Sequence, residues 1–67
     1  MTIIELREKR AKTWSAMDTF LDSHRNEKGV LNMEDDVTYS KMERDLDDLT
    51  NEIKRLERKD MIEAELN

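Results

Sequence analysis

Residues 39–56 read YSKMERDLDDLTNEIKRL, and apolar side chains recur in this stretch at alternating steps of three and four residues. This alternation holds one narrow apolar stripe on a single face of an α-helix, as in the seam of a coiled coil. The sequence therefore predicts a long helix that packs against a partner helix. The stripe consists of Tyr39, Met42, Leu46, Leu49, Ile53 and Leu56.

A second stripe with the same alternation lies nearer the start of the chain. It consists of Ile3, Leu6, Arg10, Thr13, Met17, Phe20 and His24. Between the stripes, residues 25–32 contain the only glycine, Gly29, and glycine is typical of a turn. We expect an all-α fold in a single domain, 1–67. It is a two-helix antiparallel coiled-coil hairpin with helices at about 3–24 and 33–65, and it associates into an oligomeric helical bundle.

Local signals mark the start of each predicted helix. Thr2 can cap the first helix and complete a capping box with Glu5, three residues later. Asn32 can cap the second helix, and acidic residues 34–36 then face the partial positive charge of the helix start. Glu5 and Lys9 also have the spacing that favours an ion pair on a helix.

In antiparallel pairing of the stripes, a shift by one heptad in one direction leaves no room to turn, and a shift in the other direction demands a long floppy loop, so one register is favoured. It places Lys9 near Glu52, a favourable pair of charges. A parallel pair of second helices would instead bring Glu52 towards Glu57 of the other copy, which is repulsive. The expected facing pairs are Ile3–Leu56, Leu6–Ile53, Arg10–Leu49, Thr13–Leu46, Met17–Met42 and Phe20–Tyr39.

The first stripe contains two polar residues, Arg10 and Thr13, between its apolar ones. Polar residues in a seam lower its stability and often fix its register or its choice of partner. Alternatively, Arg10 lays its apolar stem along Leu49 and keeps its charge in water.

Three apolar residues lie beside the stripes: Trp14, Leu21 and Val30. Trp14 would be half exposed in a bare two-helix hairpin. Either these residues complete the hairpin core, or they form a second interface with a partner.

After Leu56 the alternation ends, because Asp60 and Glu63 take the next places of the stripe. Three apolar residues lie outside it: Met61, Ile62 and Leu66. This tail therefore either meets a different partner or is loosely ordered.

Length and composition favour an interaction protein. A chain of 67 residues rarely obtains more than ~3–5 kcal/mol from its core, so a partner chain is the usual aid to stability. The chain has no cysteine and one histidine, which argues against disulfides and metal sites. A net charge of −5 argues against binding to nucleic acid or to an anionic membrane. No apolar run approaches the ~20 residues that cross a bilayer.

The sequence groups no side chains in the way that catalysis requires. It has no acid–base dyad, no nucleophile beside a plausible base and no glycine-rich phosphate loop. The acidic residues 34–36, and likewise Asp45, Asp47 and Asp48, lie on predicted straight helix, whereas calcium needs a bent loop. His24 lies at the end of the first helix, beside the loop. We therefore expect neither an enzyme nor a cofactor.

Two runs of this chain resemble the start of tailed-bacteriophage major capsid proteins. The first is Ile4-Glu5-Leu6-Arg7-Glu8-Lys9-Arg10-Ala11. The second comprises Leu31, Glu34-Asp35, Tyr39, Met42-Glu43, Asp45-Leu46, Ile53 and Leu56-Glu57-Arg58. In that family such a segment is called the delta, or scaffolding, domain, and it precedes the shell-forming domain. The helix–break–helix order is similar, and the resemblance covers nearly the whole chain.

The resemblance implies a role in capsid assembly within the cytoplasm of a bacterial host. The segment would lie in the interior of the immature capsid and help subunits cluster with the correct curvature. Its partners would be other copies of itself and neighbouring capsid subunits, and a phage maturation protease would later remove it. The main alternative from the residues is a stand-alone adaptor or chaperone hairpin that grips another protein through Trp14 and Leu21.

Overall fold

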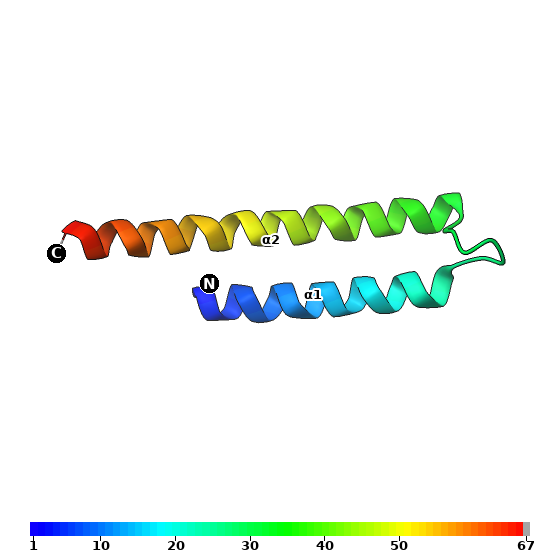
Figure 1. Ribbon diagram of the computed structural model, residues 1–67, viewed down its shortest axis with the longest axis horizontal. Coiled ribbons are helices and arrows are strands. Elements are labelled where there is room, and N and C mark those ends of the chain that lie inside the picture. Colours follow the sequence, from blue (N-terminus) through cyan, green and yellow to red (C-terminus); the bar gives the residue numbers. More distant parts are fainter. Residues whose placement is uncertain (67) are drawn as a thin grey trace.

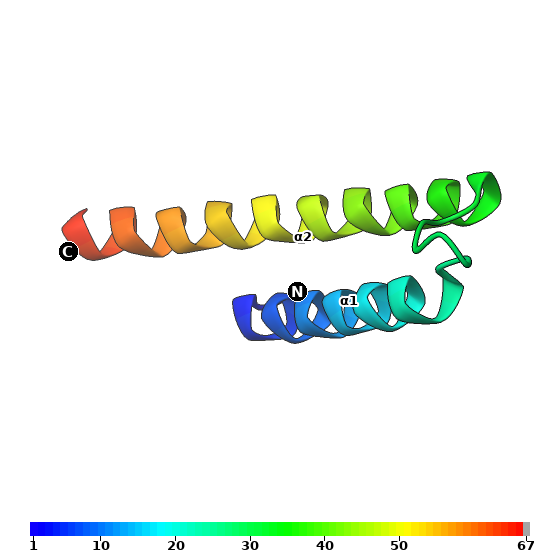
Figure 2. The ribbon, with the colours of Figure 1, turned by 45° about the vertical axis from the view of Figure 1, so that its right-hand side comes forward.

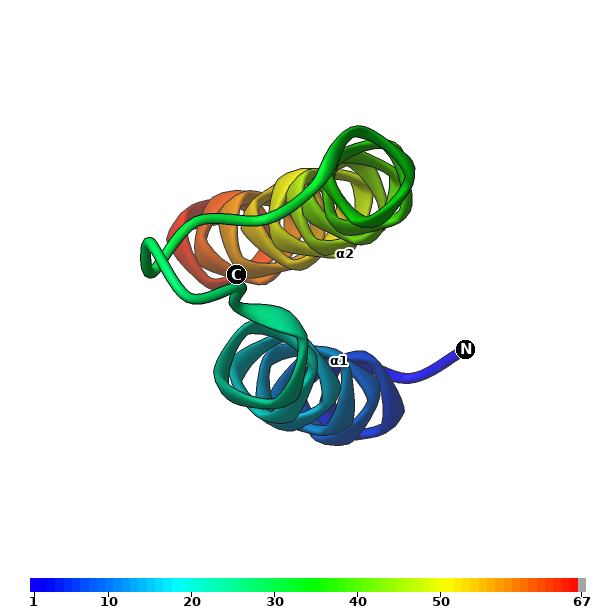
Figure 3. The same ribbon diagram turned by 90° about the vertical axis from the view of Figure 1, so that its right-hand side faces the viewer.

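The computed structural model describes residues 1–66, which form two α-helices and no strand. Helix α1 spans Ile3–His24 and helix α2 spans Met33–Leu66. The helices pack against each other as a helical hairpin, joined at one end by residues 25–32 (Figures 1 and 2). Viewed along its length, the molecule is a single pair of helices (Figure 3). The all-helical fold expected from the stripes is confirmed.

The capping box predicted at the start of α1 is present. The Glu5 backbone N–H donates to the Thr2 hydroxyl oxygen at 3.2 Å, and the Thr2 backbone N–H donates to Glu5 Oε1 at 3.3 Å. The Thr2 hydroxyl also donates to Glu5 Oε1, at 3.1 Å. Because the Glu5 carboxylate turns back to Thr2, the ion pair expected with Lys9 does not form, and that prediction is wrong.

These hydrogen bonds predict an acid-sensitive start of α1. The Thr2 backbone N–H, and then its side chain, hold the pKa of Glu5 below its ordinary value. A carboxyl with a lowered pKa in the fold stabilises that fold above its ordinary pKa, and the stabilisation is lost as pH falls through the lowered value. We expect NMR titration to find this lowered pKa, and Thr2→Ala to return it towards the ordinary one. An ordinary Glu5 pKa that Thr2→Ala leaves unchanged would contradict the capping box.

The start of α2 is capped as the sequence predicts. The Asp35 backbone N–H donates to Asn32 Oδ1 at 2.9 Å, and the first turn carries three acids at 34–36. Helix α2 remains helical to Leu66, one residue beyond the expected end, so the whole described tail is helical. In Figure 1 the tail extends past the N-terminus of α1 and has no neighbouring helix.

Asn26 organises the loop between the helices. Its side-chain oxygen accepts from the backbone N–H groups of Lys28 and Val30, at 2.9 and 3.2 Å. Its own backbone N–H donates to the Val30 carbonyl at 2.9 Å, and its carbonyl accepts from Gly29 at 2.8 Å. These four bonds fold the loop into a compact turn, which Gly29 completes with a φ of 78°.

Gly29→Ala should destabilise the hairpin by about 1 kcal/mol, because this φ lies in the left-handed region that costs an L-residue ~1–2 kcal/mol. An added Cβ would meet no atom within 4 Å, so the expected cost is in the backbone alone. Urea unfolding followed by circular dichroism measures it. Gly29→Asn is the matched control, since asparagine tolerates this conformation better. Equal stability of Gly29→Ala and the parent chain would contradict the observed turn.

Candidate helix–helix interface

The facing sides of α1 and α2 bury the apolar stripes. Three side chains are buried: Leu6 and Met17 on α1, with 6% and 2% of their surface exposed, and Ile53 on α2, with 0%. The other nine residues assigned to the helix–helix interface are half-buried, and they are Ile3, Arg10, Thr13, Phe20, Tyr39, Met42, Leu46, Leu49 and Leu56. The interface is therefore one narrow line of side chains with water along both edges.

The two polar residues of the α1 stripe are accommodated differently. Thr13 turns its hydroxyl back onto α1, where it donates to the Lys9 carbonyl at 2.9 Å. Its hydrogen bond is thus satisfied within its own helix, and the residue is half-buried. Arg10 is half-buried and lines the groove between the helices on the side of Trp14. Neither residue leaves a buried polar atom without a partner among the described residues.

Charges at the helix edges contribute little to holding the helices together. Across residues 1–66, one ion pair joins the helices, between Arg7 and Glu57 at 3.9 Å, and both side chains are about half exposed. Glu52 pairs with Arg55 of its own helix at 2.7 Å, so the contact expected between Glu52 and Lys9 does not form. Exposed pairs of this kind contribute only ~0–1 kcal/mol, so apolar contact dominates this interface.

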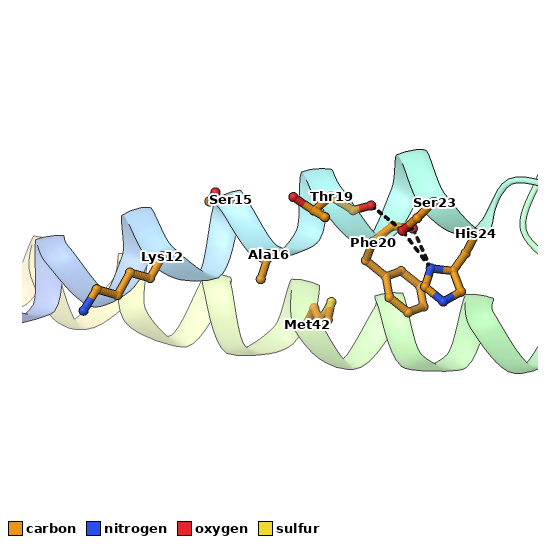
Figure 4. Close-up of a pocket in the computed structure, with 8 residues that line it drawn as sticks. All are labelled: Lys12, Ser15, Ala16, Thr19, Phe20, Ser23, His24 and Met42. Carbon is orange, nitrogen blue, oxygen red and sulfur yellow. Dashed lines mark hydrogen bonds between the residues drawn. The ribbon is translucent and has the colours of Figure 1, made fainter.

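Phe20 and His24 close the interface at the loop end of α1 (Figure 4). Their rings stack with centroids 4.0 Å apart, beside Met42 of α2 in an open groove of about 530 Å³. His24 Nδ1 lies 2.9 Å from the Phe20 carbonyl oxygen, and because a carbonyl only accepts, Nδ1 donates. His24 is itself exposed, so it finishes the helix end rather than extending the stripe.

The residues assigned to a second interface lie largely in water. Trp14 and Val30 are 56% and 54% exposed, and Leu21 is half-buried. Trp14 lines a groove of about 340 Å³ with Ala11 of α1 and Leu46 of α2. The hairpin therefore does not enclose the indole, and the reading in which Trp14 completes the hairpin core is wrong.

Further apolar side chains are exposed along α2 and at the N-terminus. The tail of α2 leaves Met61, Ile62 and Leu66 exposed on a helix that has no neighbour there. Large exposed side chains elsewhere are Met1, Ile4, Met33 and Val37. Sequence reasoning did not single out Ile4, although its spacing of seven from Ala11 and ten from Trp14 places it on their face.

The described residues offer surfaces for contact and no assembled reaction centre. No three histidine or acidic side chains within residues 1–66 are grouped so that they could hold a metal ion. The acids at the start of α2 lie along helix, where they face its N-terminus. The geometry therefore supports packing between helices as the chemistry of this chain.

Neither helix, as far as the chain is described, is both long enough and apolar enough to pass through a bilayer.

Comparison of the chain with protein-family models, with curated proteins and with solved structures finds no match.

Proposed function

We propose that this chain is a capsid-assembly scaffold segment of a phage major capsid protein. It acts by antiparallel coiled-coil packing and by self-association inside the immature shell, and proteolysis later removes it. It contains no active site in this proposal. Its partners are copies of itself and neighbouring capsid subunits.

One observation carries the proposal: the hairpin buries too few apolar side chains and exposes too many. Among residues 1–66, only three side chains are buried, whereas nine large apolar ones are exposed. Large apolar side chains that a small protein leaves exposed are candidates for contact with a partner. A second copy of the chain offers the same apolar surfaces, so self-association would cover them.

Weak association is sufficient for a scaffold. Segments that are tethered to many subunits in one shell meet at a high effective concentration, so contacts that are weak individually act together. The narrow line of buried residues and the mostly charged surface fit contacts of this strength. A net charge of −5 also keeps the segment from competing for incoming DNA.

The resemblance of the two sequence runs to the delta domain supplies the phage assignment, and the gene that encodes the chain tests it. A scaffold segment requires a shell-forming domain in frame after Asn67. The test uses the full-length capsid protein that this gene encodes. By electron microscopy, the unsubstituted protein should form closed shells, whereas the Leu49→Asp variant should give free subunits or aggregates. Leu49 is half-buried in the seam, and an unpaired charge there opposes packing. Closed shells in normal yield would contradict the proposal.

The alternative is a stand-alone coiled-coil adaptor or chaperone hairpin that binds another protein. The exposure of Trp14 favours it, because aromatic residues are common anchors of binding to other proteins. The adaptor would be favoured if the gene encodes no shell-forming domain after Asn67 and if the isolated chain remains monomeric.

A further inference from the structure

A second heptad-spaced row runs along α1, beside the row that faces α2. It consists of Ile4, Arg7, Ala11, Trp14, Asp18 and Leu21, at steps of three, four, three, four and three. Five of these residues are exposed and Leu21 is half-buried, so α2 does not cover the row. We call these six residues the outer row of α1.

The outer row is complementary to itself when it is read backwards. An antiparallel copy places Ile4 opposite Leu21, so that the apolar residues meet at both ends. It also places the cationic Arg7 opposite the anionic Asp18. In the middle, the small Ala11 lies opposite the large Trp14. A parallel copy would instead place each residue opposite itself. The Arg7–Arg7 and Asp18–Asp18 contacts would then be repulsive, and two large Trp14 side chains would compete for the same space.

The surroundings of Trp14 fit the same arrangement. Ala11 lies in the 340 Å³ groove that Leu46 and Thr50 of α2 also line. An indole from a second copy that packs over Ala11 would therefore also reach the edge of α2. Within residues 1–66, Arg7 has one ion pair, its 3.9 Å contact with Glu57, and Asp18 has none. Both charges are thus available to a second copy.

We infer that two hairpins pair through the outer rows of α1, antiparallel and about a two-fold axis that passes between Ala11 and Trp14. Such an axis makes each contact occur twice, so one dimer holds two Arg7–Asp18 pairs and two Trp14–Ala11 contacts. This inference rests on the self-association proposed above and specifies its partner, its direction and its register.

Exchange of charges tests the register by sedimentation of the full chain. Asp18→Arg and Arg7→Asp should each weaken dimerisation about tenfold, because each change replaces two attractive exposed pairs by two repulsive ones. The double variant, Arg7→Asp with Asp18→Arg, restores both pairs and should bind within about threefold of the parent. Both positions, Arg7 and Asp18, lie on exposed helix surface, and circular dichroism checks that each variant remains helical.

Two control variants separate this effect from other causes. Glu8→Arg makes the same change in net charge as Asp18→Arg but lies outside the outer row, so it should leave dimerisation unchanged. Glu57→Gln removes the partner of Arg7 within the hairpin and should also leave it unchanged. A double variant that is no better than either single variant would overturn the inference.

Cross-linking tests the direction, since the chain has no cysteine of its own. In an equal mixture of Ile4→Cys and Leu21→Cys chains, oxidation should link one variant to the other in preference to itself. Preferential self-linking of Ile4→Cys would show a parallel pair and overturn the inference. If the parent chain dimerises but the double variant does not restore dimerisation and the cross-links do not form, this register is wrong while self-association stands. If the parent chain never associates, both this inference and the proposed function are contradicted.

Discussion

Ile53→Asp should leave the chain largely unfolded at neutral pH. Among residues 1–66, Ile53 is the most deeply enclosed side chain, with 0% of its surface exposed. Burial of an unpaired carboxylate costs more than the ~3–5 kcal/mol that a core of this size supplies. The helices depend on this packing, because isolated helices are marginal in water. Circular dichroism should show the loss of most of the helical signal.

Two matched variants make this result specific to the interface. Ile53→Val removes one methylene group and should cost about 0.5–1.5 kcal/mol, so the chain should stay helical. Ile62→Asp places the same charge on the same helix at an exposed position in the tail and should leave the hairpin folded. If Ile53→Asp remained as helical as Ile62→Asp, the packing described for α1 against α2 would be wrong.

Met17→Ala should destabilise the hairpin by about 2–5 kcal/mol, which is comparable with its whole stability. Met17 is 2% exposed within the α1 stripe, and truncation leaves a cavity that neighbouring side chains fill only in part. The midpoint of urea unfolding measures the loss.

Met17→Leu keeps the volume and should cost less than about 1.5 kcal/mol. Met33→Ala, at an exposed methionine near the start of α2, should change little. A similar midpoint for Met17→Ala and Met33→Ala would contradict the placement of Met17 in the core.

The sequence predicted the helices well because their signals are local. Thr2 with Glu5 and Asn32 with Asp35 are neighbours in the chain, so the caps at both helix starts could be read from spacing alone. The alternation of three and four residues likewise marks which face of each helix is buried. These features need no knowledge of the other helix.

Features that depend on competition between partners were predicted less well. Spacing and register suggested both Glu5 and Glu52 as ion-pair partners for Lys9, yet Glu5 binds Thr2 and Glu52 binds Arg55. Spacing cannot decide which of several partners a flexible charged side chain chooses, since exposed pairs differ little in energy.

The sequence analysis missed the role of Asn26 for another reason. Its role as an acceptor for two backbone N–H groups could have been suspected from an asparagine three residues before Gly29.

The extent of burial also could not be read from the stripes. All twelve interface residues share one pattern, but only Leu6, Met17 and Ile53 are enclosed. Two helices cover each other along one line, so side chains slightly off that line keep one side in water. Enclosure of the rest requires more helices, and the sequence of one chain does not say where they come from.

Sedimentation equilibrium of the chain, from micromolar to millimolar concentration, tests the central claim of self-association most directly. We predict a mean mass that rises with concentration from the 8.0 kDa of one chain to at least that of a dimer. A single species of 8.0 kDa at every concentration would contradict the account, because the exposed apolar side chains would then have no affinity for another copy.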